Sequence, residues 1–291
     1  MALSKQISSK ETEQWDLVIG PKDKWYDLRL AELWDYRDLI SIFVRRDLVA
    51  TYKQTVLGPL WFFLSPLFTV IMFTFVFNRI AGISTDGIPA PVFYMGGTTL
   101  WNYFSACFGG ASNTFVSNAG LFGKVYFPRL AAPIAMVISN LFKFSVQMLM
   151  FLVFLFYYRM QEGNTLHFTP YLALFPLLVV LMGGMALGIG IIISSFTTKY
   201  RDLTYFIGFG VSLLMYATPV IYPVSAIPDS YRWFVEINPI SPLIEMFRLG
   251  FTGSGTVTLW GVLYSAVFTL ISLLLGAILF HRTEKTFMDT V

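Results

Sequence analysis

The 291-residue chain is strongly apolar: hydrophobic residues make up 56% of it, charged residues only 13%, and its formal net charge is +3. Soluble domains carry about a quarter of charged residues, so this composition excludes an ordinary soluble enzyme and indicates a membrane protein. The one cysteine, Cys107, can form no intrachain disulfide, and His167 and His281 stand apart from other ligand types, so no metal site is expected.

The chain begins with a polar stretch that mixes acidic and basic residues. This mixture lacks the order of a cleavable signal peptide, in which a basic segment precedes a hydrophobic one, so we predict residues 1–27 to be a cytoplasmic tail. Residues 28–50 are predicted to form an amphipathic helix lying in the membrane interface, followed by a transmembrane domain over residues 51–291. The apolar stripe of this helix consists of Leu33, Tyr36, Ile40, Phe43 and Val44.

Basic residues lie at the end of that helix and before the first apolar block: Arg45, Arg46 and Lys53, with Tyr52 beside Lys53. Near lipid headgroups a basic side chain gains about 1 kcal/mol from anionic lipid. The simpler interpretation is therefore anchoring and control of topology. The alternative is that these four residues form the access site for an anionic, lipid-linked substrate.

Six long apolar blocks fill most of the chain after residue 57. A membrane-spanning α-helix needs about 20 apolar residues, because every backbone polar group in lipid must be paired within its own segment. We therefore predict an all-α integral membrane protein with six transmembrane helices. These helices are expected at residues 57–80, 91–116, 130–158, 170–196, 203–222 and 256–280.

The distribution of lysine and arginine predicts the orientation, since these residues accumulate in cytoplasmic loops. Fifteen of the 20 basic residues precede the first block, lie in the second or fourth connector, or follow the last block. The first, third and fifth connectors hold only four. Both termini are therefore expected in the cytoplasm.

The remaining basic residue, Lys143, falls inside the third predicted span, with Asn140 and Gln147 at positions i−3 and i+4 on the same helix face. Polar groups with this spacing are expected to face the helix bundle or a cavity rather than lipid. Helix packing and contact with a substrate are both consistent with this cluster.

The fifth connector, residues 223–251, is too long for a tight turn and too apolar for a solvated loop. Proline disfavours a helical conformation in the residue before it, so Pro228 and Pro239 divide the connector into two short helices, at residues 230–237 and 242–251. We expect both helices to fold back into the outer leaflet as re-entrant segments. Glu245 and Arg248 lie three residues apart, so they are interpreted either as functional ionisable groups or as a pair on one helix face.

Five segments together resemble the membrane subunit of ABC-2-type polysaccharide exporters, the permease group for O-antigen and capsule. The similarity extends from about residue 28 to the end of the chain. The segments are RRDLVATYKQTVLGPLWFFLSPL (45–67), GKVYFPRLAAP (123–133), KYRDL (199–203), TPVIYP (218–223) and INPISPLIEMFRLGF (237–251).

The resemblance implies an assembly in the bacterial cytoplasmic (inner) membrane, with two copies of this chain and two copies of a separate ABC ATPase. It also implies a lipid-linked glycan as substrate, with no nucleic-acid partner. This chain contains no GxxxxGK[ST] motif, so ATP and Mg are expected in the partner. No cofactor and no catalytic residue are expected here.

The resemblance also implies an ATPase-coupling region and an outer gate, although the coupling segment after the second span could be an ordinary interfacial loop. The coupling residues are Gly123, Lys124, Tyr126, Phe127, Pro128, Arg129, Tyr200, Arg201 and Asp202. The gate residues are Tyr222, Asn238, Pro239, Glu245 and Arg248.

Other functions remain open at the level of sequence. A teichoic acid or capsule exporter of the same group differs only in the glycan. A secondary transporter predicts inverted repeats and midplane carboxylates, yet the first four predicted spans contain no Asp or Glu. A membrane enzyme acting on lipid-linked sugars predicts clustered acids and bases on one membrane side, and such candidates are sparse.

Overall fold

A computed structural model of the chain describes residues 30–53, 57–125, 127–161, 166–197, 200 and 202–290. Within these ranges the backbone is helical or in turns and loops, without β-strands, which confirms the all-α prediction for this part of the chain. The predicted tail, residues 1–27, lies outside the described residues.

The helices differ widely in length. In chain order they are α1 (Leu30–Asp35), α2 (Arg37–Tyr52), η1 (Gly58–Leu60), α3 (Trp61–Phe73), η2 (Thr74–Ile80), α4 (Ala90–Ser112), α5 (Thr114–Phe122), α6 (Ala131–Gln161), η3 (Pro170–Leu174), α7 (Phe175–Thr197), α8 (Leu203–Tyr216), η4 (Val224–Ala226), α9 (Asp229–Glu236), α10 (Ser241–Thr252) and α11 (Leu259–Thr290).

Each of the six predicted apolar blocks contains a helix. In the described part of the chain, four helical segments are long and apolar enough to cross a membrane: Trp61–Ile80, Ala131–Gln161, Pro170–Thr197 and Leu259–Glu284. The first of these combines α3 with η2, a π-helical turn that continues it. The other two blocks correspond to α4, which is 23 residues long, and α8, which is 14 residues long.

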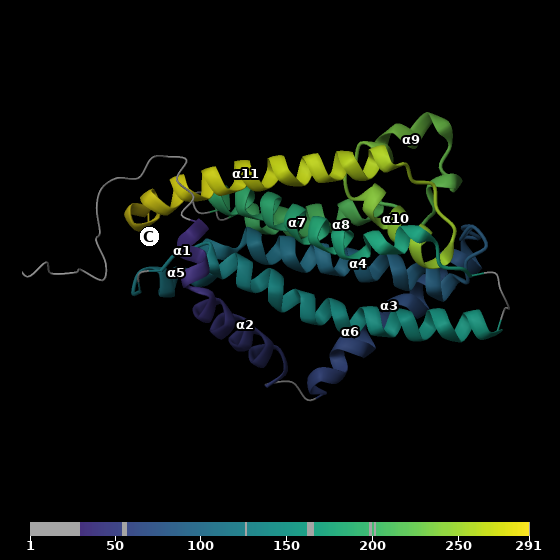
Figure 1. The fold of residues 1–291 in the computed structure, drawn as a ribbon, viewed down its shortest axis with the longest axis horizontal. Helices are drawn as coiled ribbons and strands as arrows, with labels where there is room; N and C mark the ends of the chain where they lie inside the picture. The colour runs from purple at the N-terminus through teal and green to yellow at the C-terminus, as the bar shows by residue number, and fades with distance from the viewer. Residues whose placement is uncertain are drawn as a thin grey trace, which may run out of the picture.

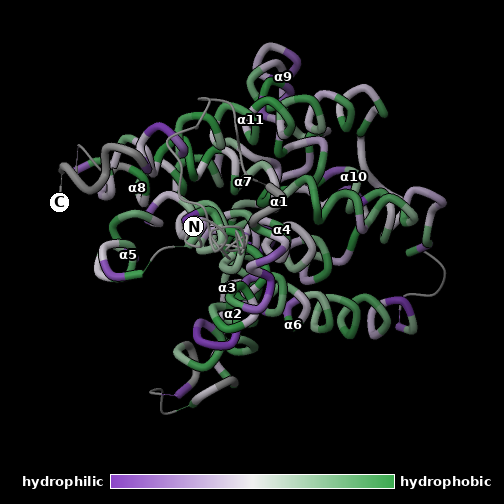
Figure 2. Tube along the Cα trace, turned by 60° about the vertical axis from the view of Figure 1, so that its left-hand side comes forward, coloured by the Kyte–Doolittle hydropathy of each residue, from purple (hydrophilic) through white to green (hydrophobic). Residues whose placement is uncertain are grey.

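Four long helices, α11, α7, α4 and α6, run side by side along the long axis of the molecule (Figure 1). Helix α4 lies in the middle, and most of its residues are buried against α6 and α7. Figure 2 shows hydrophobic residues along most of these helices and hydrophilic residues along α2 and at α5 and α9. The main core therefore lies around α4.

The two ends of the bundle carry different short helices (Figure 1). Helices α1 and α5 and the C-terminus lie at one end, whereas α9 and α10 lie at the other. The helix boundaries at this second end follow the predicted prolines, since α9 begins after Pro228 and α10 begins two residues after Pro239. Helix α10 ends at Thr252 and is capped by Gly253, whose φ of 78° is accessible to glycine at little cost.

The described residues of the predicted interface segment, 28–50, belong to α1 and α2, which are separated at Tyr36. Its apolar stripe faces the rest of the chain: Leu33 and Phe43 are buried in a second core cluster with residues of α5, α6 and α11. Tyr36, Ile40 and Val44 pack against the same cluster and are half-buried. Protein contacts therefore cover the stripe that the sequence assigned to the membrane interface.

Candidate functional site

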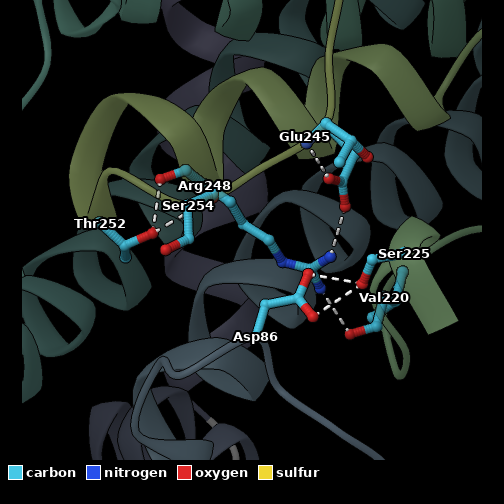
Figure 3. Close-up of polar contacts among 8 residues, drawn as sticks. Asp86, Val220, Ser225, Glu245, Arg248, Thr252 and Ser254 are labelled. Carbon is cyan, nitrogen blue, oxygen red and sulfur yellow. Dashed lines mark hydrogen bonds and ion pairs between the residues drawn. The ribbon is translucent and has the colours of Figure 1, made fainter.

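A buried ion pair lies at the α9–α10 end of the bundle (Figure 3). Glu245 and Arg248, one turn apart on α10, are only 4% and 3% exposed. Arg248 Nη1 donates a hydrogen bond of 2.8 Å to Glu245 Oε1. The structure thus brings together the two ionisable gate residues that the sequence predicted.

Both side chains of this pair also bind other parts of the chain. Arg248 Nη2 donates to the carbonyl oxygen of Val220 at 2.9 Å, and Glu245 Oε2 accepts from the backbone N–H of Thr256 at 3.1 Å. The guanidinium lies 3.8 Å from the ring centroid of Phe93 on α4. Charge-assisted and cation–π contacts are strong when solvent is excluded, so this pair holds α10 against α4, the turn after α8 and the loop before α11.

Gly97 allows Val220 and the Arg248 guanidinium to lie close to the backbone of α4. A Cβ atom at this α4 position would lie 2.8 Å from the carbonyl oxygen of Val220 and 2.9 Å from Arg248 Nη2. Neither separation leaves room for a methyl group. The network therefore depends on a glycine that the sequence reasoning did not select.

Next to the ion pair, a hydrogen bond joins the loop that contains Asp86 to Ser225 in η4. Ser225 Oγ lies 2.7 Å from each carboxylate oxygen of Asp86, to which it donates a hydrogen bond. Asp86 has a φ of 53°, in the left-handed region that aspartate tolerates better than most residues. Its charge interacts favourably with that of Arg248, and Figure 3 shows its carboxylate directed toward the guanidinium.

The other predicted gate residues fix the backbone around α9 and α10. Asn238 is buried; its Nδ2 donates to Thr218 Oγ1 at 2.8 Å, and its Oδ1 accepts from the N–H of Ile240 at 3.0 Å. The carbonyl of Pro239 accepts from Ser265 Oγ at 2.6 Å. The hydroxyl of Tyr222 donates to the carbonyl of Tyr216 at 2.8 Å.

A cavity of about 630 Å³ opens between α9, α10 and the start of α11. Arg232, Glu236 and Glu245 contribute its charged lining, together with the hydroxyl-bearing residues Ser241 and Thr256. Glu245 therefore lies at the boundary between the buried pair and this cavity.

The predicted coupling residues at the opposite end are divided between the core and the surface. Phe127 is only 4% exposed and packs edge-on against Phe43 at a centroid distance of 5.6 Å. Gly123 and Lys124 are exposed, as is Val125. The exposed residues of this segment are therefore available to a partner, whereas Phe127 anchors it from inside.

Arg129 links this segment to the C-terminal helix, and Pro128 before it is half-buried. Arg129 Nη1 donates to the backbone carbonyl of Glu284 at 2.7 Å, and its Nε lies 3.7 Å from Glu284 Oε1. The guanidinium also lies 5.5 Å from the ring centroid of Phe122. The start of α6 and the end of α11 are thus held together.

The second predicted coupling loop is described in part. Tyr200 and Asp202 are exposed at the start of α8, while Tyr126 and Arg201 lie outside the described residues.

The predicted substrate-access cations lie on α2 and immediately after it. Arg45, Arg46 and Lys53 are all exposed. Arg46 pairs with Asp47 at 2.8 Å and lies 4.8 Å from the ring centroid of Phe43. Tyr52 is the last residue of α2, and its side chain lies outside the described part.

The polar residues of the third predicted span face the bundle, as expected. Asn140 is buried, while Lys143 and Gln147 are half-buried. Gln147 Oε1 accepts a hydrogen bond of 3.2 Å from Asn102 Nδ2 on α4. Asn102 was missed at the sequence level, because its partner lies 45 residues away and no local pattern connects them.

The described residues contain no group of three or more His, Cys, Asp or Glu side chains able to hold a metal ion. A bundle of long apolar helices whose polar ends are held by hydrogen bonds and ion pairs is the architecture of a multi-pass membrane protein. The family model of the ABC-2 type transporter matches residues 38–252. The chain therefore belongs to the ABC-2 type transporter family, as its five segments indicated.

Curated relatives align over most of this chain and of their own lengths. An O-antigen export system permease protein RfbA of Klebsiella pneumoniae is 28% identical over 257 residues, covering 87% of this chain and 94% of the relative. RfbA of Myxococcus xanthus is 29% identical over 222 residues, covering 75% and 82%. The polysialic acid transport protein KpsM of Escherichia coli is 23% identical over 252 residues, covering 84% and 93%.

Proposed function

We propose that this chain is the permease subunit of an ABC transporter that exports an O-antigen-like, lipid-linked polysaccharide across the cytoplasmic membrane. The observation that carries this proposal is the near full-length similarity to O-antigen export permeases, at 28% identity over 87% of the chain. The apolar helical bundle is compatible with a membrane-embedded path. A partner ATPase supplies the energy, with ATP and Mg bound in that partner.

The proposed assembly contains two copies of this chain and two ATPase subunits. Exposed apolar side chains on α8 and α11, including Phe209, Leu213, Trp260 and Leu263, provide surfaces for lipid or for the second copy. The path for the glycan lies between the copies, because buried apolar side chains pack most of the interior of the single bundle around α4.

The proposed topology has six crossings, with both termini in the cytoplasm. The crossings are α3 with η2, α4, α6, η3 with α7, α8, and α11. Residues 1–27 form the cytoplasmic tail, 28–50 the interface helix and 51–291 the transmembrane domain. This arrangement places α5 and the end of α11 on the cytoplasmic side and α9 and α10, as re-entrant helices, on the outer side.

In this orientation the exposed part of the 123–129 segment and the loop before α8 meet the ATPase. The α9–α10 unit closes the outward end of the path, with the Glu245–Arg248 pair setting its position against α4. The cations of α2 and Lys53 face the cytoplasmic headgroup layer, where the diphosphate of a lipid-linked glycan lies. Arginine and lysine bind such groups through charge-assisted hydrogen bonds.

The test is deletion of the gene in its own host, with complementation by the intact chain. If the chain exports the glycan, the deletion strain should lose the glycan from its surface and accumulate the lipid-linked glycan inside the cell. Unchanged surface glycan and no internal accumulation would overturn the proposal.

A capsule exporter is the second candidate, because the polysialic acid transport protein KpsM aligns over 84% of this chain. The same deletion strain separates the two candidates. Loss of glycan from the lipopolysaccharide fraction supports O-antigen export, whereas loss from the capsule fraction supports capsule export.

A further inference from the structure

A second cavity, of about 280 Å³, lies inside the bundle between the first half of α3 and the middles of α4 and α6. Its volume is about nine times the ~30 Å³ that a water molecule takes in the liquid, so it has room for a small polar group with some water. The residues with polar side-chain atoms that line it are Ser65, Thr69, Asn102, Tyr103, Asn140, Lys143 and Gln147.

This lining is rich in hydrogen-bond donors and contains no carboxylate. Lys143 contributes an ammonium group, and the amides and hydroxyls can also donate. Asn102 Nδ2 donates to Gln147 Oε1, which leaves the amide nitrogen of Gln147 free to donate to another group. A donor-rich pocket of this kind is suited to an anion with several acceptor oxygens.

Lys143 has no hydrogen bond or ion pair within the part of the chain that the structure describes. Two acidic groups have charges that reach it, Asp47 on α2 and the thiol of Cys107 on α4. The carboxylate of Asp47 is engaged by Arg46 at 2.8 Å. A charged side chain at membrane depth is costly unless it is paired or hydrated, so the pocket lacks a close counter-charge.

The α3 side of the pocket is the least covered by the rest of the chain. In the segment Trp61–Ile80, which is α3 with η2, only 11% of the most apolar stretch is buried. Trp61 and Phe62, at the first turn of α3, also line the pocket, and Trp61 is half exposed. Tryptophan favours the headgroup level of a bilayer, so the aromatic side of the pocket lies where lipid phosphates are found.

We propose that this pocket binds the phosphate of a membrane lipid, with Lys143 as the counter-charge and Gln147 and Asn102 as hydrogen-bonding neighbours. The phosphate belongs either to an anionic phospholipid of the bilayer or to a polyprenyl diphosphate. The phospholipid source is independent of the proposed export function, whereas the polyprenyl source rests on it.

The experiment uses the full-length chain in nanodiscs of phosphatidylcholine alone, phosphatidylcholine with phosphatidylglycerol, or phosphatidylcholine with undecaprenyl diphosphate. Native mass spectrometry measures the lipid retained on release. Loss of a charge-assisted hydrogen bond weakens binding about tenfold, so K143Q should retain about tenfold less of the bound lipid. K143R should retain most of it, and R79Q, a change at an exposed arginine near the end of η2, should match the wild-type chain.

Gln147→Glu provides a second test if K143Q does not fold. A carboxylate at position 147 lies one turn from Lys143 and would pair with it, so this variant should fold and lose the same lipid. Selective retention of phosphatidylglycerol identifies a bilayer phospholipid as the source, and selective retention of undecaprenyl diphosphate identifies a polyprenyl lipid. If K143Q and Gln147→Glu each retain as much phosphatidylglycerol and as much undecaprenyl diphosphate as the wild-type chain does, the proposal is wrong.

Discussion

Arg248 and Glu245 form a buried ion pair on one face of α10, with Nη1 and Oε1 2.8 Å apart. The sequence left two interpretations of these residues open, a gating role and a helix-face pair. The structure contains the pair. In addition, Arg248 contacts the Val220 carbonyl and the Phe93 ring, and Glu245 accepts a hydrogen bond from the Thr256 N–H. The pair therefore fixes the α9–α10 unit on the bundle, and any gating motion must carry this network as a unit or break it.

Removing one member of the pair should destabilise the protein strongly. Arg248→Met or Glu245→Leu leaves an uncompensated buried charge, which costs about 3–5 kcal/mol. The double variant should lose less than the sum of the single losses, since the two sites are coupled. Thermal unfolding of the purified chain in detergent measures the effect.

The surface pair on α9 is the matched control for this prediction. Arg232 and Asp229 have the same i,i+3 spacing at 3.4 Å, but the Asp229 side chain is 95% exposed. Asp229→Asn should therefore change stability by less than about 1 kcal/mol. If the Glu245 and Arg248 variants unfold at the wild-type temperature but alter glycan export, the pair serves gating rather than structure.

Two glycines of α4 provide a second prediction about the same region. Gly97→Ala places a methyl group against Val220 and Arg248, and overpacking of this kind costs about 1–3 kcal/mol. Gly109→Ala is the control, because a Cβ atom there meets nothing within 4 Å. Alanine exceeds glycine in helix propensity by about 1 kcal/mol, so Gly109→Ala should be neutral or stabilising. A lower unfolding temperature for Gly109→Ala than for Gly97→Ala would contradict the packing.

Local rules predicted the helices of this fold but not their partners. The apolar blocks are long enough to identify the helices, and proline geometry placed the boundaries of α9 and α10 within one or two residues. The Glu245–Arg248 spacing is also local. The contact between Asn102 and Gln147, the stacking of Arg248 on Phe93 and the burial of Phe127 depend on how distant segments pack. No pattern in a single sequence contains that information.

The apolar stripe of α1 and α2 is a second example of what a single sequence does not predict. Its periodicity predicts one apolar face, and that face exists. Periodicity does not distinguish a face covered by lipid from one covered by protein, because both are apolar surroundings. The structure covers Leu33 and Phe43 with the chain itself.

The coupling segment yields a prediction about its exposed residues. Val125 is 56% exposed beside Lys124, so Val125→Cys in a Cys107→Ser background should form a crosslink to the ATPase in the assembled transporter. Phe127→Cys should crosslink poorly, because that side chain is buried against Phe43. A bifunctional thiol–amine reagent and gel analysis measure both. Efficient crosslinking from position 127 with none from position 125 would mean that the segment rearranges on assembly.

The last prediction concerns the cations of the substrate-access site. Arg45, Arg46 and Lys53 are exposed on or directly after α2, and a diphosphate headgroup gains from charge-assisted hydrogen bonds to such groups. Replacing all three by glutamine should reduce substrate-stimulated ATPase activity of the assembled transporter more than its basal activity. Arg79→Gln is the control, because Arg79 is also exposed but lies at the end of η2, on the predicted outer side. If stimulation survives the triple change at normal expression and orientation, these residues only anchor α2, and the headgroup reaches the transporter elsewhere.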